Sequence, residues 1–579
     1  MKGYAAGVPS WTRSPQSTLI RSIRPGPSAT LRFTATGSGA WTPGHEQGAI
    51  VSPAPPKATA WAPMAIPIFR ILWGAQMASN IGTWMQTVGA QWMLVHQPNA
   101  AALTSAVQAA SLLPVLFVSL PAGVLADVLD RRRILIVLSL LMTALAGALA
   151  ALTRAGLTTP TVLLTLTFLM GCGQALVNPA WQAIQPELVP RELIPAAAAL
   201  NSLNVNIARA VGPALAGLII AASGPFVVFT VNAASFAAIT LAVLAWRRPA
   251  DDRATAEHLL PALRSGTRYV RNAPGVRRIL LRSALFVVPA SALWALLPIT
   301  ASRTLHLGAG GYGLLLAALG IGAVLGALAI RPLRELAGDN TRLAVATLLF
   351  AAGTATCALA HNAVLVAIVL VPTGAGWLVN LSSLNTALQL LLPAWVRARG
   401  LALYLVVFMG GQGIGALLWG LVAGTAGLTT ALLASAVLLA AGTATLPLWP
   451  MHSHPGGQDR SITSTWPEPA LDLNPDPDDG PILVEVTYTV SPEHSDAFLT
   501  AMHPVERSRR RTGAERWNLF RDAARPDHYI EVFQVPSWSE HLRQHDGRTT
   551  ATDADLLDTA TALTSQPPAI RHLLPPPRP

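Results

Sequence analysis

Twelve long apolar segments limit this chain to a membrane-embedded fold. They contain 18 to 29 residues each, and a helix needs about 20 to cross the hydrocarbon core of a bilayer. The segments are residues 67–95, 101–126, 134–153, 159–180, 200–222, 225–246, 280–300, 311–330, 343–360, 362–383, 401–424 and 428–449. Because only short polar breaks separate most of them, the pattern predicts an all-α membrane protein with 12 transmembrane helices.

The charged residues support this fold class. They make up only 12% of the chain, against about 25% in soluble domains. The net charge of +11 invites a nucleic-acid hypothesis, but the arginines gather in alternate loops, as they do in membrane proteins. One side has Arg154 and Arg303, whereas the other has Arg131–Arg133, Arg191, the eight arginines of residues 247–278, Arg331, Arg334, Arg342, Arg397 and Arg399. We therefore expect cytoplasmic termini, a plasma-membrane location and no nucleic-acid partner.

An unusual loop joins the second and third segments. It reads Gly123-Val-Leu-Ala-Asp127-Val-Leu-Asp130-Arg131-Arg132-Arg133. A plain positive-inside loop needs only the arginines, whereas an aspartate at the membrane edge can hold a partner in one conformational state and release it in another. The loop resembles the Gly-x-Leu-Ala-Asp-x-x-x-Arg-Arg loop of major facilitator superfamily transporters, from which Asp130 departs. The resemblance implies a conformational latch built from Gly123, Asp127, Arg131, Arg132 and Arg133.

Amide side chains recur along the first segment. Gln76, Asn80, Gln86 and Gln91 lie at helical spacings, so that several of them can face the bundle interior. Both cavity lining and hydrogen bonding between helices are consistent with this spacing. The stretch Ser79-Asn-Ile-Gly-Thr-Trp-Met-Gln86 resembles the first helix of the transmembrane secretion effector subfamily, which includes enterobactin-type siderophore exporters. Thr83 stands where relatives often carry a membrane aspartate.

The fourth and fifth segments carry further candidate residues. The proline-rich connector 178–192 resembles the corresponding loop of the same subfamily, and its Glu187, Arg191 and Glu192 either exchange partners with the Asp127 loop or form a solvated turn. In the fifth segment, the Gly-Pro pair resembles the signature of facilitator-family antiporters and so implies export. Arg209 faces a cavity if it lies deep, or snorkels if it lies near the cytoplasmic edge. The cavity or gating candidates here are Asn204, Arg209, Gly212 and Pro213.

A weak internal repeat divides the segments into two halves. Leu176-Val-Asn178 recurs as Leu378-Val-Asn380, and Gly212 and Gly217 recur as Gly415 and Gly420. We expect six-helix halves at 63–246 and 279–449, joined by a cytoplasmic connector at 247–278, with Asn380 as a further cavity candidate. The resemblance implies that the halves rock about a central site.

The two ends of the chain are more polar than the apolar segments between them. Residues 1–62 are expected to be a disordered extension, whose translation in the cell is open, and residues 450–480 a linker. The residue pattern of 481–579 predicts a cytoplasmic α+β domain of order βαββαβ. Its strands are expected at 482–490, 515–521, 528–535 and 568–574. This order resembles the dimeric ferredoxin-like domains of the antibiotic-biosynthesis-monooxygenase type, which implies homodimerisation.

Titratable residues in the terminal domain give no clear reaction centre. His541 and His545 are four residues apart and can share a metal ion, but no glutamate accompanies them in a His-Glu-x-x-His arrangement. We therefore expect surface histidines, no metal and no cofactor. Trp517, Tyr529 and Trp538 are expected in the core.

Together these features predict a transporter and not an enzyme. The resemblance implies export of a small amphipathic molecule, such as a siderophore, an antibiotic or another drug-like metabolite, across the lipid bilayer by alternating access. It also implies proton antiport, although Asp127 is the only acidic residue at or within the predicted spans, and uniport stays open. The alternatives are a membrane-tethered monooxygenase-like enzyme and a non-transporting sensor, both of which would use the terminal domain.

Overall fold

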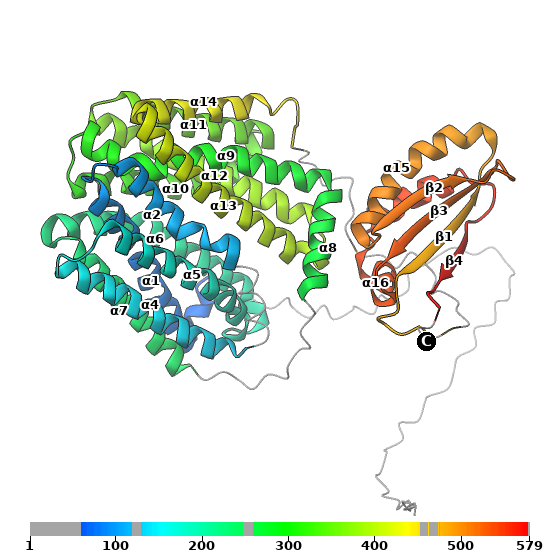
Figure 1. Ribbon diagram of the computed structural model, residues 1–579, viewed down its shortest axis with the longest axis horizontal. Helices are drawn as coiled ribbons and strands as arrows, with labels where there is room; N and C mark the ends of the chain where they lie inside the picture. Colours follow the sequence, from blue (N-terminus) through cyan, green and yellow to red (C-terminus); the bar gives the residue numbers. More distant parts are fainter. Residues whose placement is uncertain are drawn as a thin grey trace, which may run out of the picture. The chain divides into compact units, whose positions relative to one another are not determined.

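The computed structural model describes residues 60–118, 129–246, 259–451, 461, 473 and 475–576. The latch candidates Gly123 and Asp127 lie outside these residues, as do nearly all of the extension 1–62 and most of the linker 450–480. Within the described part, the chain forms two groups of long helices, followed by a small domain with one β-sheet (Figure 1).

The first half contains six of the expected helices. They are α1 (Pro67–Leu94), α2 (Ala100–Leu112), α4 (Arg131–Arg154), α5 (Pro160–Ile184), α6 (Ile194–Ser223) and α7 (Pro225–Ala245). Local sequence sets their ends: proline occupies the first turn of α1, α5, α6 and α7, where its missing N–H costs no hydrogen bond. Asp130 accepts a hydrogen bond from the backbone N–H of Arg133 and caps α4.

The connector and the second half follow the same pattern. They form α8 (Leu259–Asn272), α9 (Pro274–Ile299), α10 (Ala309–Leu336), α11 (Asp339–Leu359), α12 (Ala363–Leu391), α13 (Ala394–Ala426) and α14 (Leu428–Ala444). The helix α8 lies within the expected connector, residues 247–278. The short connection between α13 and α14 is Gly427. Its φ of +93° is a backbone conformation that a residue with a side chain rarely adopts, and it ends α13 before α14 begins.

Ten helical spans of the described residues are long and apolar enough to cross a membrane, judged by length and composition, with the span of α2 counted from Ala100 to Val118. Those ten do not include α1, which carries the four amides, or α14, whose 17 residues form a shorter apolar helix. Many large apolar side chains on the helix bundle are exposed, among them Phe117, Leu328 and Leu421. In water this surface would be unfavourable, whereas lipid covers it without cost. The chain is therefore a multi-pass membrane protein.

The halves pack against each other through α6 on α10 and α2 on α13 (Figure 1). Small residues allow this contact: a Cβ atom added to Gly217 on α6 would lie 2.8 Å from the Cα atom of Gly313 on α10. A Cβ atom on Gly413 of α13 would lie 2.8 Å from a side-chain carbon of Leu113. Close backbone approach of this kind favours van der Waals packing between membrane helices.

The terminal domain has the predicted βαββαβ order with one additional helix, α17, between β3 and β4. Its strands are β1 (Ile482–Thr489), β2 (Arg516–Arg521), β3 (His528–Val535) and β4 (Ala569–Leu573), in the antiparallel order β2-β3-β1-β4. Its helices are α15 (Ser495–Thr512), α16 (Trp538–Arg543) and α17 (Ala551–Thr561), with a π-helical turn at Gln544–Arg548. Alternate residues of β1 are buried, as the sequence alternation predicts. Phe498 and Tyr529 belong to the core that these elements enclose.

Candidate functional site

The described part of the predicted latch forms contacts within the first half. Arg131 at the start of α4 makes an ion pair with Glu187, with Nη1 and Oε1 2.8 Å apart. The neighbouring Arg132 donates hydrogen bonds to the carbonyl oxygens of Val243 and Leu244 at the end of α7. Arg131 therefore ties α4 to the connector after α5, and Arg132 ties α4 to α7.

The other charged candidates near this end do not join that contact. Arg133 is exposed, and so are Arg191 and Glu192 in the 3-10 turn Arg191–Leu193. Of the three connector residues that the sequence singles out, the structure places Glu187 next to the arginines of α4. The sequence spacing alone does not distinguish it from Glu192.

A chain of amides links α1 to α6. Gln76 donates to Oδ1 of Asn80 over 3.0 Å, and Asn80 donates to Oδ1 of Asn204 over 2.9 Å. Asn204, which is fully buried, donates in turn to the backbone oxygen of Trp73 over 3.0 Å. Each of these bonds lies within the first half. The observed bonds of Gln76, Asn80 and Asn204 therefore hold two helices of the same half together.

Gln86 and Gln91 of α1 have different surroundings. Gln86 is buried within the first half, where it accepts a hydrogen bond from Asn232 of α7 and contacts the sulfur of Met170 on α5. Gln91 lies across the boundary between the halves. Its Oε1 accepts a 2.7 Å hydrogen bond from the hydroxyl of Tyr312 on α10, and its Nε2 donates to the backbone oxygen of Trp294 on α9 over 3.4 Å.

Arg209 lies in the middle of α6. Its guanidinium carbon is 5.7 Å from the ring centroid of Trp84 on α1, a cation–π arrangement. Trp84 also contacts Trp294 of the second half, with ring centroids 6.1 Å apart. Gly212, about one turn after Arg209, permits the close approach of α6 and α1, because a Cβ atom at Gly212 would lie 2.7 Å from Cβ of Trp84. Pro213, the next residue, is also buried. Arg209 is thus one aromatic ring away from the boundary between the halves.

Asn380 lies inside the second half, on α12. It is buried in α12, donates a 2.8 Å hydrogen bond to Thr347 of α11, and lines a small cavity of the second half together with Arg282 of α9. The structure therefore does not bring Asn380 together with Gln91 or Arg209. The internal repeat relates its position to Asn178 but gives no information on its neighbours.

A group of aromatic residues meets at the boundary between the two halves, and the sequence does not predict it. Tyr312 stacks on Trp92 with centroids 5.9 Å apart, and Trp294 meets Trp377 edge to face at 5.4 Å. Around Trp377 gather three further rings of the second half, those of Phe286, Phe350 and Phe408. Single aromatic residues inside apolar segments show no period, so no sequence signal marks them as a group.

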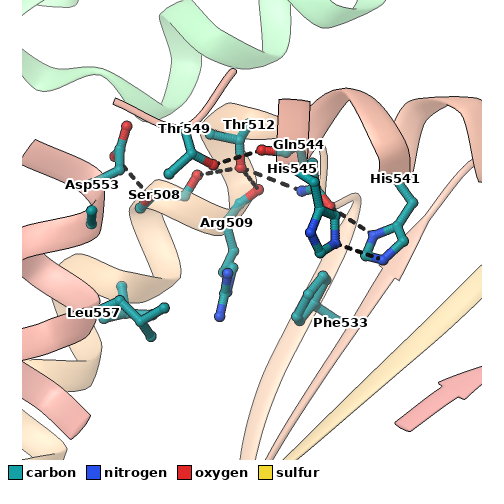
Figure 2. A pocket seen from close by; sticks show the side chains of 12 residues that line it. Ser508, Arg509, Thr512, Phe533, His541, Gln544, His545, Thr549, Asp553 and Leu557 are labelled. Atoms are coloured by element: carbon teal, nitrogen blue, oxygen red, sulfur yellow. Dashed lines mark hydrogen bonds between the residues drawn. The ribbon is translucent and has the colours of Figure 1, made fainter. Parts of the chain in front are cut away.

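The terminal domain encloses a small polar cavity between α15, the π-helical turn and α17 (Figure 2). Its volume of about 20 Å³ suffices for about one ordered water or an ion. Arg509 enters it from α15 and is paired with the buried Glu531, Nε to Oε1 over 3.0 Å. Asp553 accepts hydrogen bonds from Ser508 and Thr550. A drug-sized ligand needs a far larger pocket of about 300 Å³ or more.

One expectation for this domain is wrong. His541 is not a surface residue: it is 1% exposed, and burial, followed by the neighbouring His545 and His572, lowers its pKa to about 3. The sequence gives no sign of this, because His572 comes from β4 and reaches His541 only through the fold. Trp538 and Tyr529 are buried as expected.

Comparison with known proteins finds relatives among membrane transporters. The profile of the transmembrane secretion effector family matches residues 58–579. The staphyloferrin A transporter of Staphylococcus aureus is 33% identical over 145 residues, which are 24% of this chain and 36% of that protein. The multidrug efflux pump Tap of Mycobacterium tuberculosis is 28% identical over 219 residues, 36% of this chain and 51% of that protein. The aligned part thus spans about a third to a half of the length of these curated relatives.

Solved structures agree in fold. The nucleoside transporter NupG has a TM-score of 0.54 at 15% identity, covering 66% of this chain and 99% of that chain. A bacterial homolog to the human lysosomal transporter Spinster, in an inward-facing and unoccupied conformation, has a TM-score of 0.52 at 14% identity, covering 66% and 96%. At such identities the likeness concerns the fold alone.

Proposed function

Because the chain belongs to the transmembrane secretion effector family of the major facilitator superfamily, we propose that it exports a small amphipathic molecule across the plasma membrane by alternating access. The curated relatives are, by their names, a transporter of staphyloferrin A and a multidrug efflux pump, and the matching family is that of transmembrane secretion effectors. Twelve membrane spans, with α1 and α14 completing the set, and cytoplasmic termini belong to this proposal, as does homodimerisation through the terminal domain.

The observation that carries the proposal is the polar contact between the halves. Gln91 of α1 bonds to Tyr312 and to the backbone of Trp294, and at the same end Arg303 donates to the backbone oxygen of Gln97 over 3.2 Å. Hydrogen bonds of this kind are weak enough to break, about 0.6 kcal/mol each on average. They suit a closure that forms in one state of a rocking transporter and opens in the other.

At the end of the first half where α4 begins, the Arg131–Glu187 pair supports a latch. Its two side chains are partly exposed, so the pair can exchange partners without the large cost of exposing a buried charge. Asp127 and Gly123 complete this latch in our proposal. Arg191 and Glu192, both exposed, are available as alternative partners when the halves move.

Arg209 suggests what the cargo carries. A cation near the bilayer centre costs about 2.5–3.5 kcal/mol on insertion scales, and such residues usually face a cavity or pathway. Here it is held over Trp84, next to the aromatic contacts between the halves. An acidic group together with an apolar or aromatic body therefore suits this place, which fits siderophore-like and drug-like metabolites.

Proton coupling is part of the proposal, and the carriers that the chain itself offers lie at the rim. They are the carboxylates Asp127 and Glu187 near the latch or a rim histidine, and a protonatable cargo is the alternative carrier. None of the amides along α1 and α6 can carry a proton in this way.

Efflux from cells tests this function. Cells that express the chain are loaded with a panel of siderophores and drugs, and export is followed for the wild type and Asp127→Asn, with and without an uncoupler. We expect export of at least one compound, lowered by the substitution and by the uncoupler. No export by a correctly inserted protein would remove the exporter proposal. Export that is insensitive to the uncoupler would remove only the proton coupling.

A further inference from the structure

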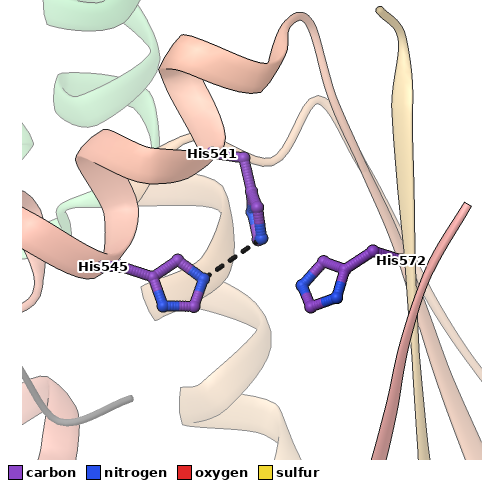
Figure 3. A group of neighbouring side chains, drawn as sticks. All are labelled: His541, His545 and His572. Atoms are coloured by element: carbon purple, nitrogen blue, oxygen red, sulfur yellow. Dashed lines mark hydrogen bonds between the residues drawn. The ribbon is translucent and has the colours of Figure 1, made fainter. Parts of the chain in front are cut away.

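Three histidines converge at one edge of the terminal domain (Figure 3). His541 comes from α16, His545 from the π-helical turn that follows it, and His572 from β4. The pairing of β4 with β1 brings His572 across from a distant part of the chain. One nitrogen from each of the three rings can be chosen so that all lie within 4.8 Å of one another.

The separation of the first two rings suits a shared ion. Nε2 of His541 and Nε2 of His545 are 3.1 Å apart. Two imidazole nitrogens that bind one ion at about 2.0–2.1 Å are separated by about 2.9–3.4 Å when the angle at the metal lies between octahedral and tetrahedral values. His572 needs a side-chain movement of about 1.5 Å to complete the set, which its half-buried position on β4 permits.

Neighbouring residues orient the His541 ring and favour the tautomer that a metal ligand needs. Nδ1 of His541 lies 3.3 Å from Oε1 of Gln544, so that a proton on Nδ1 leaves the lone pair of Nε2 facing His545. A hydrogen bond of this kind on the second ring nitrogen is usual for metal-binding histidines, because it sets the tautomer and holds the ring. Trp538 packs against both His541 and His572, with centroids 5.4 and 6.1 Å away.

The cavity of Figure 2 adjoins two of these rings and leaves room for a further ligand. His541 and His545 line it, and its volume of about 20 Å³ holds about one water molecule. Arg509, a cation that acts on His541, is paired with Glu531 at 3.0 Å, which reduces its repulsion of a metal ion. In addition, Nε2 of His572 is buried without a hydrogen-bond partner among the described residues. A metal ion would satisfy it.

We propose that His541, His545 and His572 bind one divalent transition-metal ion of the zinc or copper type, with water at the remaining position. Three neutral imidazoles suit Zn²⁺, Cu²⁺ and Ni²⁺, whereas Mg²⁺ and Ca²⁺ prefer oxygen ligands. The ion would join α16, the π-helical turn and β4. This site goes beyond export and does not depend on it.

Metal binding by the full chain, purified in detergent without a histidine tag, tests the site. The protein is stripped with a chelator, and the affinity for Zn²⁺ is measured by competition with a chromophoric chelator, with metal content determined by mass spectrometry. We expect one ion per chain for the wild type and for His503→Ala, an exposed histidine of α15. His572→Gln and His541→Gln should each bind at least about tenfold more weakly.

A second measurement needs no substitution. In the wild-type chain, Zn²⁺ should protect His545 and His572 from modification by diethylpyrocarbonate, while His503 stays reactive and Mg²⁺ gives no protection. Equal affinity of the wild type and His572→Gln would overturn the three-histidine site, as would modification of His572 at the same rate with and without Zn²⁺.

Discussion

Tyr312 of α10 donates its hydroxyl hydrogen to Oε1 of Gln91 on α1 over 2.7 Å, and this bond joins the two halves of the membrane domain. The tyrosine ring stacks on Trp92 at the same place. Under alternating access, both contacts must separate when this end of the bundle opens. In the proposed transport cycle, they therefore belong to one state.

Tyr312→Phe removes that hydrogen bond and keeps the ring. Because such a bond contributes about 0.6 kcal/mol, we expect a shift of about threefold toward the state in which this end is open. Distances between spin labels in the loops 95–99 and 305–308 measure the two populations. Tyr404→Phe is the matched control, since Tyr404 is buried within the second half and should leave the populations unchanged. Equal populations in wild type and Tyr312→Phe would contradict the gating role.

Glu187→Gln tests the latch contact at the start of α4. The ion pair with Arg131 is partly exposed and is worth about 0.2–1 kcal/mol, so we expect export to change by about fivefold or less. The exchanged pair, Arg131→Glu with Glu187→Arg, should recover part of the loss. Glu192→Gln, at an exposed position of the same connector, serves as the control. If Glu192→Gln has the same effect as Glu187→Gln, the contact with Arg131 is not the cause.

Arg209→Gln tests the proposed contact with an acidic cargo. A hydrogen bond to a charged group contributes about 1.5–3 kcal/mol, so loss of the cation should weaken binding by about tenfold or more. Arg209→Lys keeps the charge and should retain part of the affinity. The control is Arg70→Gln, an exposed arginine in the first turn of α1. Binding of a purified, exported compound to the detergent-solubilised protein provides the measurement, and unchanged affinity in Arg209→Gln would exclude a direct contact.

Most helices and strands can be predicted from this sequence because each has a local cause. Prolines and capping residues mark the helix starts, and alternation marks β1. The helix α17 is missed, although Thr550 and Asp553 form a capping box that the sequence contains. Recognition of that pair would have predicted it.

The neighbours of individual side chains are harder to predict. Gln86 and Gln91 are five residues apart on α1, and five residues turn a helix by about 140° beyond one full turn. One faces Asn232 of its own half, and the other faces Tyr312 across the boundary. Helical spacing shows that they face different directions, but not which direction meets the other half. The same limit applies to His572, whose position beside His541 depends on strand pairing.

Arg282→Ala is expected to lower the stability of the second half. The guanidinium donates to the backbone oxygens of Gly442, Thr445 and Trp449 and so holds the carboxyl end of α14. Its loss should cost about 1.5–3 kcal/mol, since these hydrogen bonds involve a charged donor at a helix C-terminus. Thermal unfolding in detergent should show a lower Tm. The exposed Arg331→Ala is the control, and a comparable loss of Tm in both variants would contradict the helix-end explanation.

Acidification is expected to loosen the terminal domain through Asp553. Burial raises the pKa of this carboxyl, but Arg511 and the hydrogen bonds from Ser508 and Thr550 outweigh it, so that the pKa lies below its ordinary value. A carboxyl with a lowered pKa in the folded state stabilises the fold above its unfolded pKa of about 4, and this contribution is lost as the pH falls through the folded value.

Asp553→Asn should therefore lower the protection of α17 and α15 against hydrogen exchange at pH 7 and make that protection less dependent on pH below about 4. Exchange rates corrected for the intrinsic effect of pH provide the measurement. Asp555→Asn, at an exposed position one turn or less away on α17, should leave both the protection and its pH dependence unchanged. If acid loosened α17 equally in the wild type and in Asp553→Asn, the acid sensitivity would have to arise from a carboxyl other than Asp553.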